Sequence, residues 1–164
     1  MARWADVERT EPAFAAAVRT RLDAHRHKMI ATLRADGSPR ISGVETTFSD
    51  GDLWLGMMPG SRKAQDLRRD PRLALHSGSP DPDDADPSRW AGDAKLSGRA
   101  EEVTDAEGYR RYAGDAQGAP EPGSFHLFRI EIDDVTLVRI GDPPDRLLIE
   151  TWRQGAGVSR VERT

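Results

Sequence analysis

Two Asp-Gly pairs constrain the fold of this chain more than any other local feature. They are Asp36-Gly37 and Asp50-Gly51, and they divide residues 27–58 into three short runs rich in β-forming residues. An Asp-Gly pair between two such runs is a strong hairpin signal, because its residues tolerate the positive φ angles of a tight turn. The stretch therefore predicts a meander of three antiparallel strands.

The hydrophobic pattern of these runs predicts how the strands are buried. In the first two runs, side chains suited to a core alternate with others, which indicates one buried face. The core-facing sets are Met29, Ala31 and Leu33, and Val44, Thr46 and Phe48. Residues 53–58, LWLGMM, are apolar on both faces. In an antiparallel sheet this pattern suggests a barrel wall whose outer face meets a second subunit or another element.

The other elements follow from periodicity, capping residues and turn signals. A helix is expected over 10–25, with Thr10 as its N-cap and an apolar stripe of Phe14, Val18 and Leu22. Two shorter helices are expected over 61–69 and 104–113, the second starting with a capping box of Thr104 and Glu107. Further strands are expected over 72–77, 94–103, 125–140 and 146–152, the third of them bent near Asp133.

These elements describe one domain, residues 1–164, of the α+β class, built mainly from antiparallel strands around a small barrel. Residues 78–92, GSPDPDDADPSRWAG, are expected to form an acidic, solvated loop. A calcium loop is excluded there, because Asp86 and Gly92 occupy the positions where an EF-hand needs glycine and glutamate. Residues 153–164 are expected to be a flexible tail.

Composition excludes several classes of function. The chain has no cysteine, so it has no disulfides, thiolate metal sites or cysteine nucleophiles. Its formal charge of −4 argues against a nucleic-acid-binding protein. Neither a run of 18 apolar residues nor a secretory leader is seen, so we expect a cytoplasmic protein that does not contact membranes. No spacing of catalytic or metal-ligating side chains rises above chance, and we assign neither catalytic residues nor a metal.

Two cations, Arg62 and Lys63, follow a Pro-Gly-Ser turn at the start of the short helix over 61–69. Cations are disfavoured there, because the first turn of a helix already carries partial positive charge. The same N–H groups and charges suit a phosphate. The spacing of Gly56, Gly60 and Lys63 does not fit a Walker A loop. The alternative is a solvated helix end, with Lys63 paired to Asp66 or to an aspartate of the acidic loop.

Three segments resemble the pyridoxamine 5′-phosphate oxidase-like family, the flavin-binding split β-barrels. They are ATLRADGSPRISGVE, LWLGMMPGSRKAQDLRRDPRLALHS and KLSGRAEEV, in the order and spacing of that family. The resemblance implies a six-stranded antiparallel split barrel that forms a homodimer, with one FMN in each of two clefts at the interface. It also implies an oxidoreductase that transfers hydride between the flavin and a small organic substrate, with a nicotinamide or a deazaflavin as electron source.

The resemblance further implies which residues contact the FMN. Ser61, Arg62 and Lys63 match the family's phosphate-binding step, and residues 40–44 match the strand that lies along the flavin ring. Backbone groups of the neighbouring strand would meet the flavin edge. Two tryptophans could cover the ring from the partner subunit, but for either of them core packing or a dimer contact is the default expectation. Apart from the phosphate-binding residues, the implied contacts are Arg40, Ile41, Ser42, Gly43, Val44, Leu55, Gly56, Met57, Trp90 and Trp152.

The sequence also departs from the family pattern. Asp66 stands where many relatives carry asparagine, and the C-terminal segment WRQGAGVSRVERT has no histidine for a substrate phosphate. Vitamin B6 oxidation is therefore not the expected activity. Two alternatives stay open, a deazaflavin-dependent reductase of the same fold and a non-enzymatic flavin- or haem-binding protein.

Overall fold

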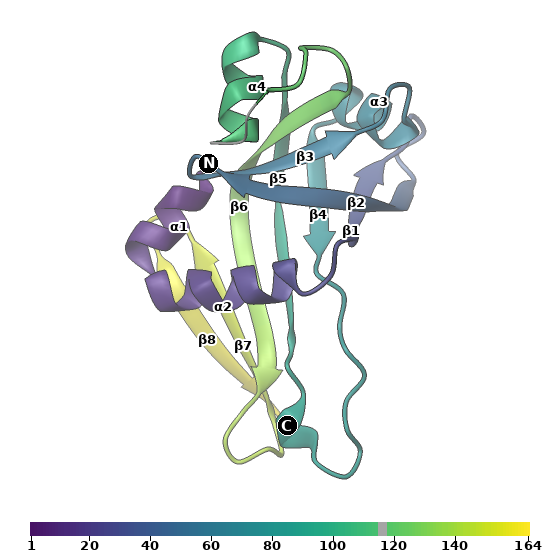
Figure 1. Cartoon of the computed structure of the whole chain (residues 1–164). Coiled ribbons are helices and arrows are strands. Elements are labelled where there is room, and N and C mark those ends of the chain that lie inside the picture. Colours follow the sequence, from purple (N-terminus) through teal and green to yellow (C-terminus); the bar gives the residue numbers. More distant parts are fainter. Residues whose placement is uncertain (115–117) are drawn as a thin grey trace.

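The computed structural model describes residues 1–114 and 118–164, which form a curled antiparallel sheet with helices packed around it (Figure 1). The strands are β1 (Lys28–Leu33), β2 (Pro39–Ser49), β3 (Asp52–Met57), β4 (Arg72–His76), β5 (Asp93–Val103), β6 (His126–Ile140), β7 (Leu147–Arg153) and β8 (Gly157–Arg163). The helices are α1 (Trp4–Thr10), α2 (Pro12–Asp23), α3 (Arg62–Arg69) and α4 (Ala106–Ala113), with a short 3₁₀ turn η1 (Pro87–Arg89).

The strands lie side by side in the order β3-β2-β1-β4-β5-β6-β7-β8, and β3 also pairs with β6. This second pairing closes β1 to β6 into a barrel of six strands, while β7 and β8 extend the sheet beyond it. The predicted fold class, a mainly β, six-stranded antiparallel barrel with a few helices, is confirmed. Helices α1 and α2 pack beside β7 and β8, whereas α3 and α4 lie at the other end of the molecule (Figure 1).

Both Asp-Gly turns form as predicted. Gly37 has a φ of 81°, and Asp50 and Gly51 have φ angles of 50° and 71°, in the left-handed region that these residues tolerate. Strand β2 changes partner along its length, because residues 39–44 pair with β1 and residues 45–49 pair with β3. In the described residues, the other edge of 39–44 therefore has no strand partner.

The predicted burial of β1 is wrong by one residue. Ile30 is fully buried and Lys28 and Thr32 share its inward face, whereas Met29 points outward and is 46% exposed. The inward threonine is satisfied by a hydrogen bond from its hydroxyl to Asp66, at 2.9 Å. Because side chains alternate along a strand, the inward position of Ile30 places the predicted core-facing set, Met29, Ala31 and Leu33, on the outside of the barrel.

Strand β3 is buried on both faces, as its sequence predicts, but the cover comes from the same chain. Leu53 and Leu55 lie in the main core, while Trp54 packs in a second cluster with Tyr109 of α4 and Leu127 of β6. Strand β3 therefore gives no reason to expect a second subunit.

The two ends of the chain differ from the sequence-based expectation. The predicted helix over 10–25 begins at Pro12 and ends at Asp23, and a separate helix α1, with Trp4 and Val7 buried, precedes it. Thr10 belongs to α1 and does not cap α2. The segment expected as a flexible tail contains β8, which pairs with β7 over 157–163. Most of its exposed residues are polar, as is common for an edge strand, although Val161 is 47% exposed, and that polarity resembles the composition of a tail.

Other local predictions are confirmed or corrected in detail. Helix α4 is capped by Asp105, whose carboxylate accepts a hydrogen bond from the Gly108 N–H at 2.9 Å, and Thr104 is not the cap. Strand β6 is irregular at Asp133, because Ser97 faces Asp134 while Gly98 faces Ile132. Residues 78–92 form a long loop with only η1 inside it. No helix among the described residues is long and apolar enough to cross a bilayer.

Candidate functional site

The short turn between β3 and α3 organises the candidate site. Gly60 in this turn has a φ of 75°, and Ser61 caps α3 by accepting a hydrogen bond from the Ala64 N–H at 3.3 Å. The next two residues are Arg62 and Lys63. Among the residues that the structure describes, no carboxylate forms an ion pair with either cation. Within the described part of the chain, two positive charges therefore stand at the positive end of a helix without an ion-pair partner.

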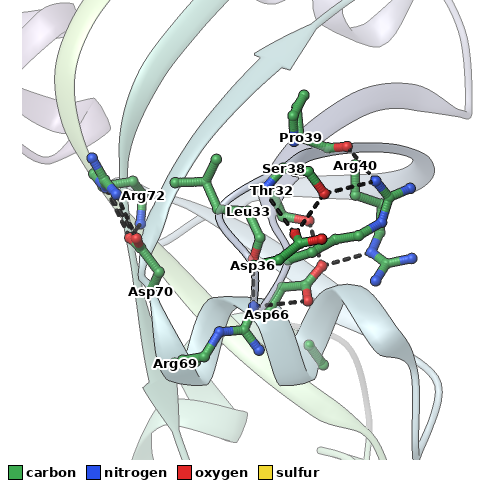
Figure 2. A network of polar contacts seen from close by, with 12 residues as sticks. Thr32, Leu33, Asp36, Ser38, Pro39, Arg40, Asp66, Arg69, Asp70 and Arg72 are labelled. Atoms are coloured by element: carbon green, nitrogen blue, oxygen red, sulfur yellow. Dashed lines mark hydrogen bonds and ion pairs between the residues drawn. The ribbon is translucent and has the colours of Figure 1, made fainter.

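Asp66, the alternative partner for Lys63, is occupied elsewhere (Figure 2). Its side chain is only 5% exposed, and it accepts hydrogen bonds from Arg40 Nε at 2.6 Å, from Arg69 at 3.1 Å and from Thr32 Oγ1 at 2.9 Å. Burial alone would raise the pKa of the Asp66 carboxyl, but these three hydrogen bonds outweigh burial and hold the pKa below its ordinary value. Asp66 is therefore a charged residue that ties α3 to β1 and β2.

A cleft of about 650 Å³ opens on the outer surface of the barrel beside this turn. Gly43 of β2 and Gly56 of β3 line it, with Met57, Met58 and Lys63 towards the turn. Tyr112 and Phe125 line it from α4 and from the segment before β6, and their ring centroids are 5.7 Å apart. The volume lies within the range of small-molecule sites, and the lining combines apolar groups with a few polar ones, as such sites do.

The two glycines keep the cleft open to a flat ligand. A Cβ added at Gly43 would have no atom within 4 Å, whereas one added at Gly56 would lie 3.5 Å from the Phe125 ring and 3.6 Å from the Tyr112 hydroxyl. A glycine on a strand often marks close approach of another group to the backbone. The edge of 39–44 that lacks a strand partner includes Gly43, so its backbone groups are available to a ligand in the cleft.

A second pocket, of about 580 Å³, lies on the other side of the turn. Four arginines, Arg34, Arg40, Arg62 and Arg69, and two aspartates, Asp36 and Asp66, line it together with Gly60. The lining thus carries a net positive charge, and we call it the basic pocket. Lys63 lines the cleft and Arg62 lines the basic pocket, because consecutive helical residues point about 100° apart. The two cations therefore flank the turn from opposite sides.

Comparison with known proteins identifies the family of this chain. The family profile described as pyridoxamine 5′-phosphate oxidase matches residues 14–139. The chain belongs to the pyridoxamine 5′-phosphate oxidase family. A search of curated proteins found no match.

Several solved structures share the fold of this chain. A pyridoxamine 5′-phosphate oxidase-related, FMN-binding protein from Nostoc punctiforme is 15% identical, with a TM-score of 0.61, and the match covers 100% of this chain and 98% of that one. PhzG from Burkholderia lata, solved with tetrahydrophenazine-1-carboxylic acid, is 14% identical with a TM-score of 0.60, covering 94% and 89%. ChuZ from Campylobacter jejuni is 15% identical with a TM-score of 0.63, covering 94% and 65%. At these identities the likeness shows the fold alone.

The structure brings together only some of the residues that the family resemblance implies. The cleft contains Gly43, Val44, Gly56, Met57 and Lys63, and the basic pocket contains Arg40 and Arg62. Ile41 points outward and is 75% exposed, and Leu55 lies in the core, fully buried and paired with strands on both sides, so it does not reach a ligand. Ser42 lines neither space, and Ser61 serves as the cap of α3.

The two tryptophans do not line either space. Trp152 is 1% exposed in the main core, and its indole N–H donates to the Thr10 hydroxyl at 2.9 Å, so core packing, the default expectation for this residue, is what the structure shows, and Trp152 does not cover a ring. The Trp90 indole N–H donates within its own loop, to the Pro80 carbonyl at 2.9 Å. Sequence reasoning missed Tyr112, Phe125, Arg34 and Arg69. The only available signal for the aromatic pair was a tyrosine and a phenylalanine at the two ends of one connection.

Proposed function

We propose that this protein binds FMN in the cleft and acts as a flavin-dependent oxidoreductase on a small organic substrate. One observation carries the proposal: Arg62 and Lys63 lack described carboxylate partners at a helix N-terminus that adjoins a glycine-lined cleft. Family membership supports it, and the match to an FMN-binding protein from Nostoc punctiforme is consistent with it.

The residues present fit the cofactor. Lys63, which lines the cleft, would hold the phosphate with a charge-assisted hydrogen bond, and Arg62 would add its positive charge from the other side of the turn. The unpaired edge of β2 would meet the polar edge of the ring. Gly43, which leaves open space, fits the close approach of a flat ring. Arg40 would act on the phosphate only indirectly, since its guanidinium is already bound to Asp66.

When bound, the flavin supplies the hydride chemistry, and the protein positions it and controls access to it. Tyr112 and Phe125 would exclude water from one side of the cleft. Tyr109, buried beneath them, holds this wall in place, because its hydroxyl donates to the Phe125 carbonyl at 2.5 Å and accepts from the Gly123 N–H at 3.1 Å. The wall formed by Tyr112 and Phe125 is therefore held in place by hydrogen bonds of the fold itself.

We further propose that a second copy of the chain completes the site. Ile41, Ala31 and Ala74 stand directly opposite one another across β2, β1 and β4 on the outer face of the barrel, and Met29 stands beside Gly43 in the next row. The face is apolar and continuous with the cleft through Gly43, as expected of a subunit interface. Light scattering at micromolar concentration should give a dimeric mass for the wild type and a smaller mass for Ile41→Glu. A monomeric wild type would contradict this interface.

The phosphate contact is tested by titrating FMN and riboflavin into the wild type and Lys63→Ala. A charge-assisted hydrogen bond is worth about 1.5–3 kcal/mol, so the Kd for FMN should rise about tenfold to a hundredfold. Riboflavin has the same ring without the phosphate, and its weaker affinity should barely change. Arg153→Ala, which removes a cation from the end of β7, is the matched control and should leave both affinities unchanged.

The other outcomes of this titration are equally informative. Equal losses for FMN and riboflavin would mean that Lys63 acts on the ring or on the fold. No loss for either would return Arg62 and Lys63 to a solvated helix end. Tight binding of a deazaflavin or of haem in place of FMN would select one of the two alternatives that the sequence left open.

A further inference from the structure

Glu45 of β2 stands beside the two glycines of the cleft. Along β2, Gly43 and Glu45 are exposed on the outer face of the barrel, while Val44 between them is buried. Across the sheet, Glu45 is paired directly with Gly56 of β3, and both residues line the cleft. Directly opposite residues lie about 5 Å apart, and residues two positions apart on one strand lie about 7 Å apart. A flat ring over the two glycines therefore lies about 5–7 Å from the base of the Glu45 side chain.

The charges around Glu45 are arranged unevenly. Among the described residues that line the cleft, Glu45 is the one carboxylate, and Lys63 is the one lysine or arginine. Glu45 accepts a hydrogen bond from Arg26 Nε at 3.1 Å, and His27 Nε2 lies 3.4 Å from the same oxygen. Arg26 is 79% exposed and lies outside the described lining of the cleft, whereas Lys28 points into the barrel and is 4% exposed. The full charge that pairs with Glu45 thus comes from the solvent side and leaves the carboxylate facing the cleft.

We propose that Glu45 lowers the reduction potential of the flavin in the cleft. This inference rests on the proposed function. Two-electron reduction of a flavin at pH 8 takes up one proton and leaves one negative charge on the ring. A carboxylate beside the ring repels that charge, but it interacts only weakly with the neutral oxidised ring, so it disfavours the reduced form. Lys63 would contact the phosphate, whose charge is the same in both forms, and its effect on the potential is smaller.

The sign of this effect bears on the class of substrate. A flavin with a lowered potential releases its hydride more readily, so Glu45 favours transfer from the reduced flavin to an oxidised organic substrate over transfer in the opposite direction. The size of the effect is limited, because the Glu45 side chain is 51% exposed and water and salt screen its charge. For unit charges about 7 Å apart, at effective dielectric constants between about 80 and 40, the equilibrium constant for reduction changes about three- to eightfold.

The test compares the reduction potential of bound FMN in the wild type and in Glu45→Gln. Each FMN-loaded protein is reduced slowly at pH 8 in the presence of a reference dye, and the absorption bands of flavin and dye are followed together. Histidines are ordinarily neutral at this pH. Glutamine keeps the shape of the side chain and an acceptor for Arg26, but it has no charge. The potential of the variant should be higher by about 15–25 mV, the two-electron equivalent of a three- to eightfold change.

Glu162→Gln is the matched control. Glu162 of β8 is 55% exposed and pairs with an arginine, Arg146, at 3.0 Å, but it lies outside the described lining of the cleft, so its loss should leave the potential unchanged. Added salt should shrink the difference between wild type and Glu45→Gln, because salt screens a charge but does not undo a displacement of the ring.

The outcomes separate this inference from the proposed function. Equal potentials for wild type and Glu45→Gln, a lower potential in the variant, or a difference that salt leaves unchanged would overturn the role of Glu45 even if both proteins hold FMN. A wild type that holds no FMN would refute the proposed function itself, and the inference with it.

Discussion

Replacing Asp66 with asparagine should change stability and ligand affinity in opposite directions. Asparagine has nearly the same shape and keeps a carbonyl acceptor, but it loses the charge that strengthens the bonds from Arg40 and Arg69. A hydrogen bond to a charged group is worth about 1.5–3 kcal/mol and a neutral one about 0.5–1.5 kcal/mol. For two bonds, less the desolvation that the charge no longer costs, the expected loss of unfolding free energy is about 1–2 kcal/mol.

The same change should tighten FMN binding, because it removes a negative charge from the basic pocket and leaves the two arginines uncompensated. Taking a separation of about 8 Å between the removed charge and the phosphate as an assumption, Coulomb's law gives about 0.5–2 kcal/mol at effective dielectric constants between about 80 and 20. The Kd for FMN should therefore fall about two- to thirtyfold. Urea unfolding without ligand gives the stability, and a fluorescence titration with FMN gives the affinity.

Asp70→Asn is the matched control. Asp70 pairs with Arg72 on the other side of α3, away from the basic pocket (Figure 2), so its loss should leave FMN affinity unchanged. A fall in both stability and affinity for Asp66→Asn would mean that the charge of Asp66 shapes the site and does not compete with the ligand. No change in either would refute the network itself.

Three further predictions follow from named contacts. The pKa of Asp66 is held below its ordinary value, so its contribution to stability is present above the unfolded-state pKa of about 3.9 and is lost as the pH falls through the folded-state pKa. The difference in unfolding free energy between wild type and Asp66→Asn, measured by urea unfolding, should therefore shrink below about pH 4. Asp105→Ala should lower the unfolding free energy by about 1 kcal/mol by removing the cap of α4, whereas Thr104→Ala should change it by less than about 0.5 kcal/mol. The same urea unfolding assay checks both variants, and a larger loss of stability for Thr104→Ala would reverse the assignment of the cap. Gly43→Val should change the unfolding free energy by less than about 1 kcal/mol, because a Cβ there meets no atom within 4 Å, but it should raise the Kd for FMN at least tenfold by filling the cleft. Unchanged FMN affinity in a titration would place the ring elsewhere.

Local signals in the sequence were enough to predict the meander, the short helix α3 and the turn before it. The Asp-Gly pairs and Ser61 act through their own backbone neighbours, so no distant partner is needed to interpret them. The faces of β1 could not be predicted in this way. An inward Thr32 depends on Asp66, which is 34 residues away in the sequence, and an inward Lys28 leaves Met29 exposed.

The candidate site could be predicted only in part, because some of its residues depend on contacts with residues far away in the sequence. Lys63, Gly43 and Gly56 could be assigned because they lie in segments with a family pattern. Tyr112 and Phe125 reach the cleft only because Tyr109 fixes both sides of one long connection. The core position of Trp152 could not be separated from a role at the ring, because its partner Thr10 is 142 residues away and no periodicity in β7 indicates that contact.

The central claim is that the cleft holds FMN, and the most direct test is an absorption spectrum of the protein after incubation with excess FMN and removal of the free cofactor by desalting. The structure predicts that the protein keeps an equimolar amount of FMN with a flavin spectrum altered from that of free FMN, and that riboflavin treated in the same way is largely lost. A protein that retains no FMN, or that keeps haem with a Soret band in its place, would contradict the account.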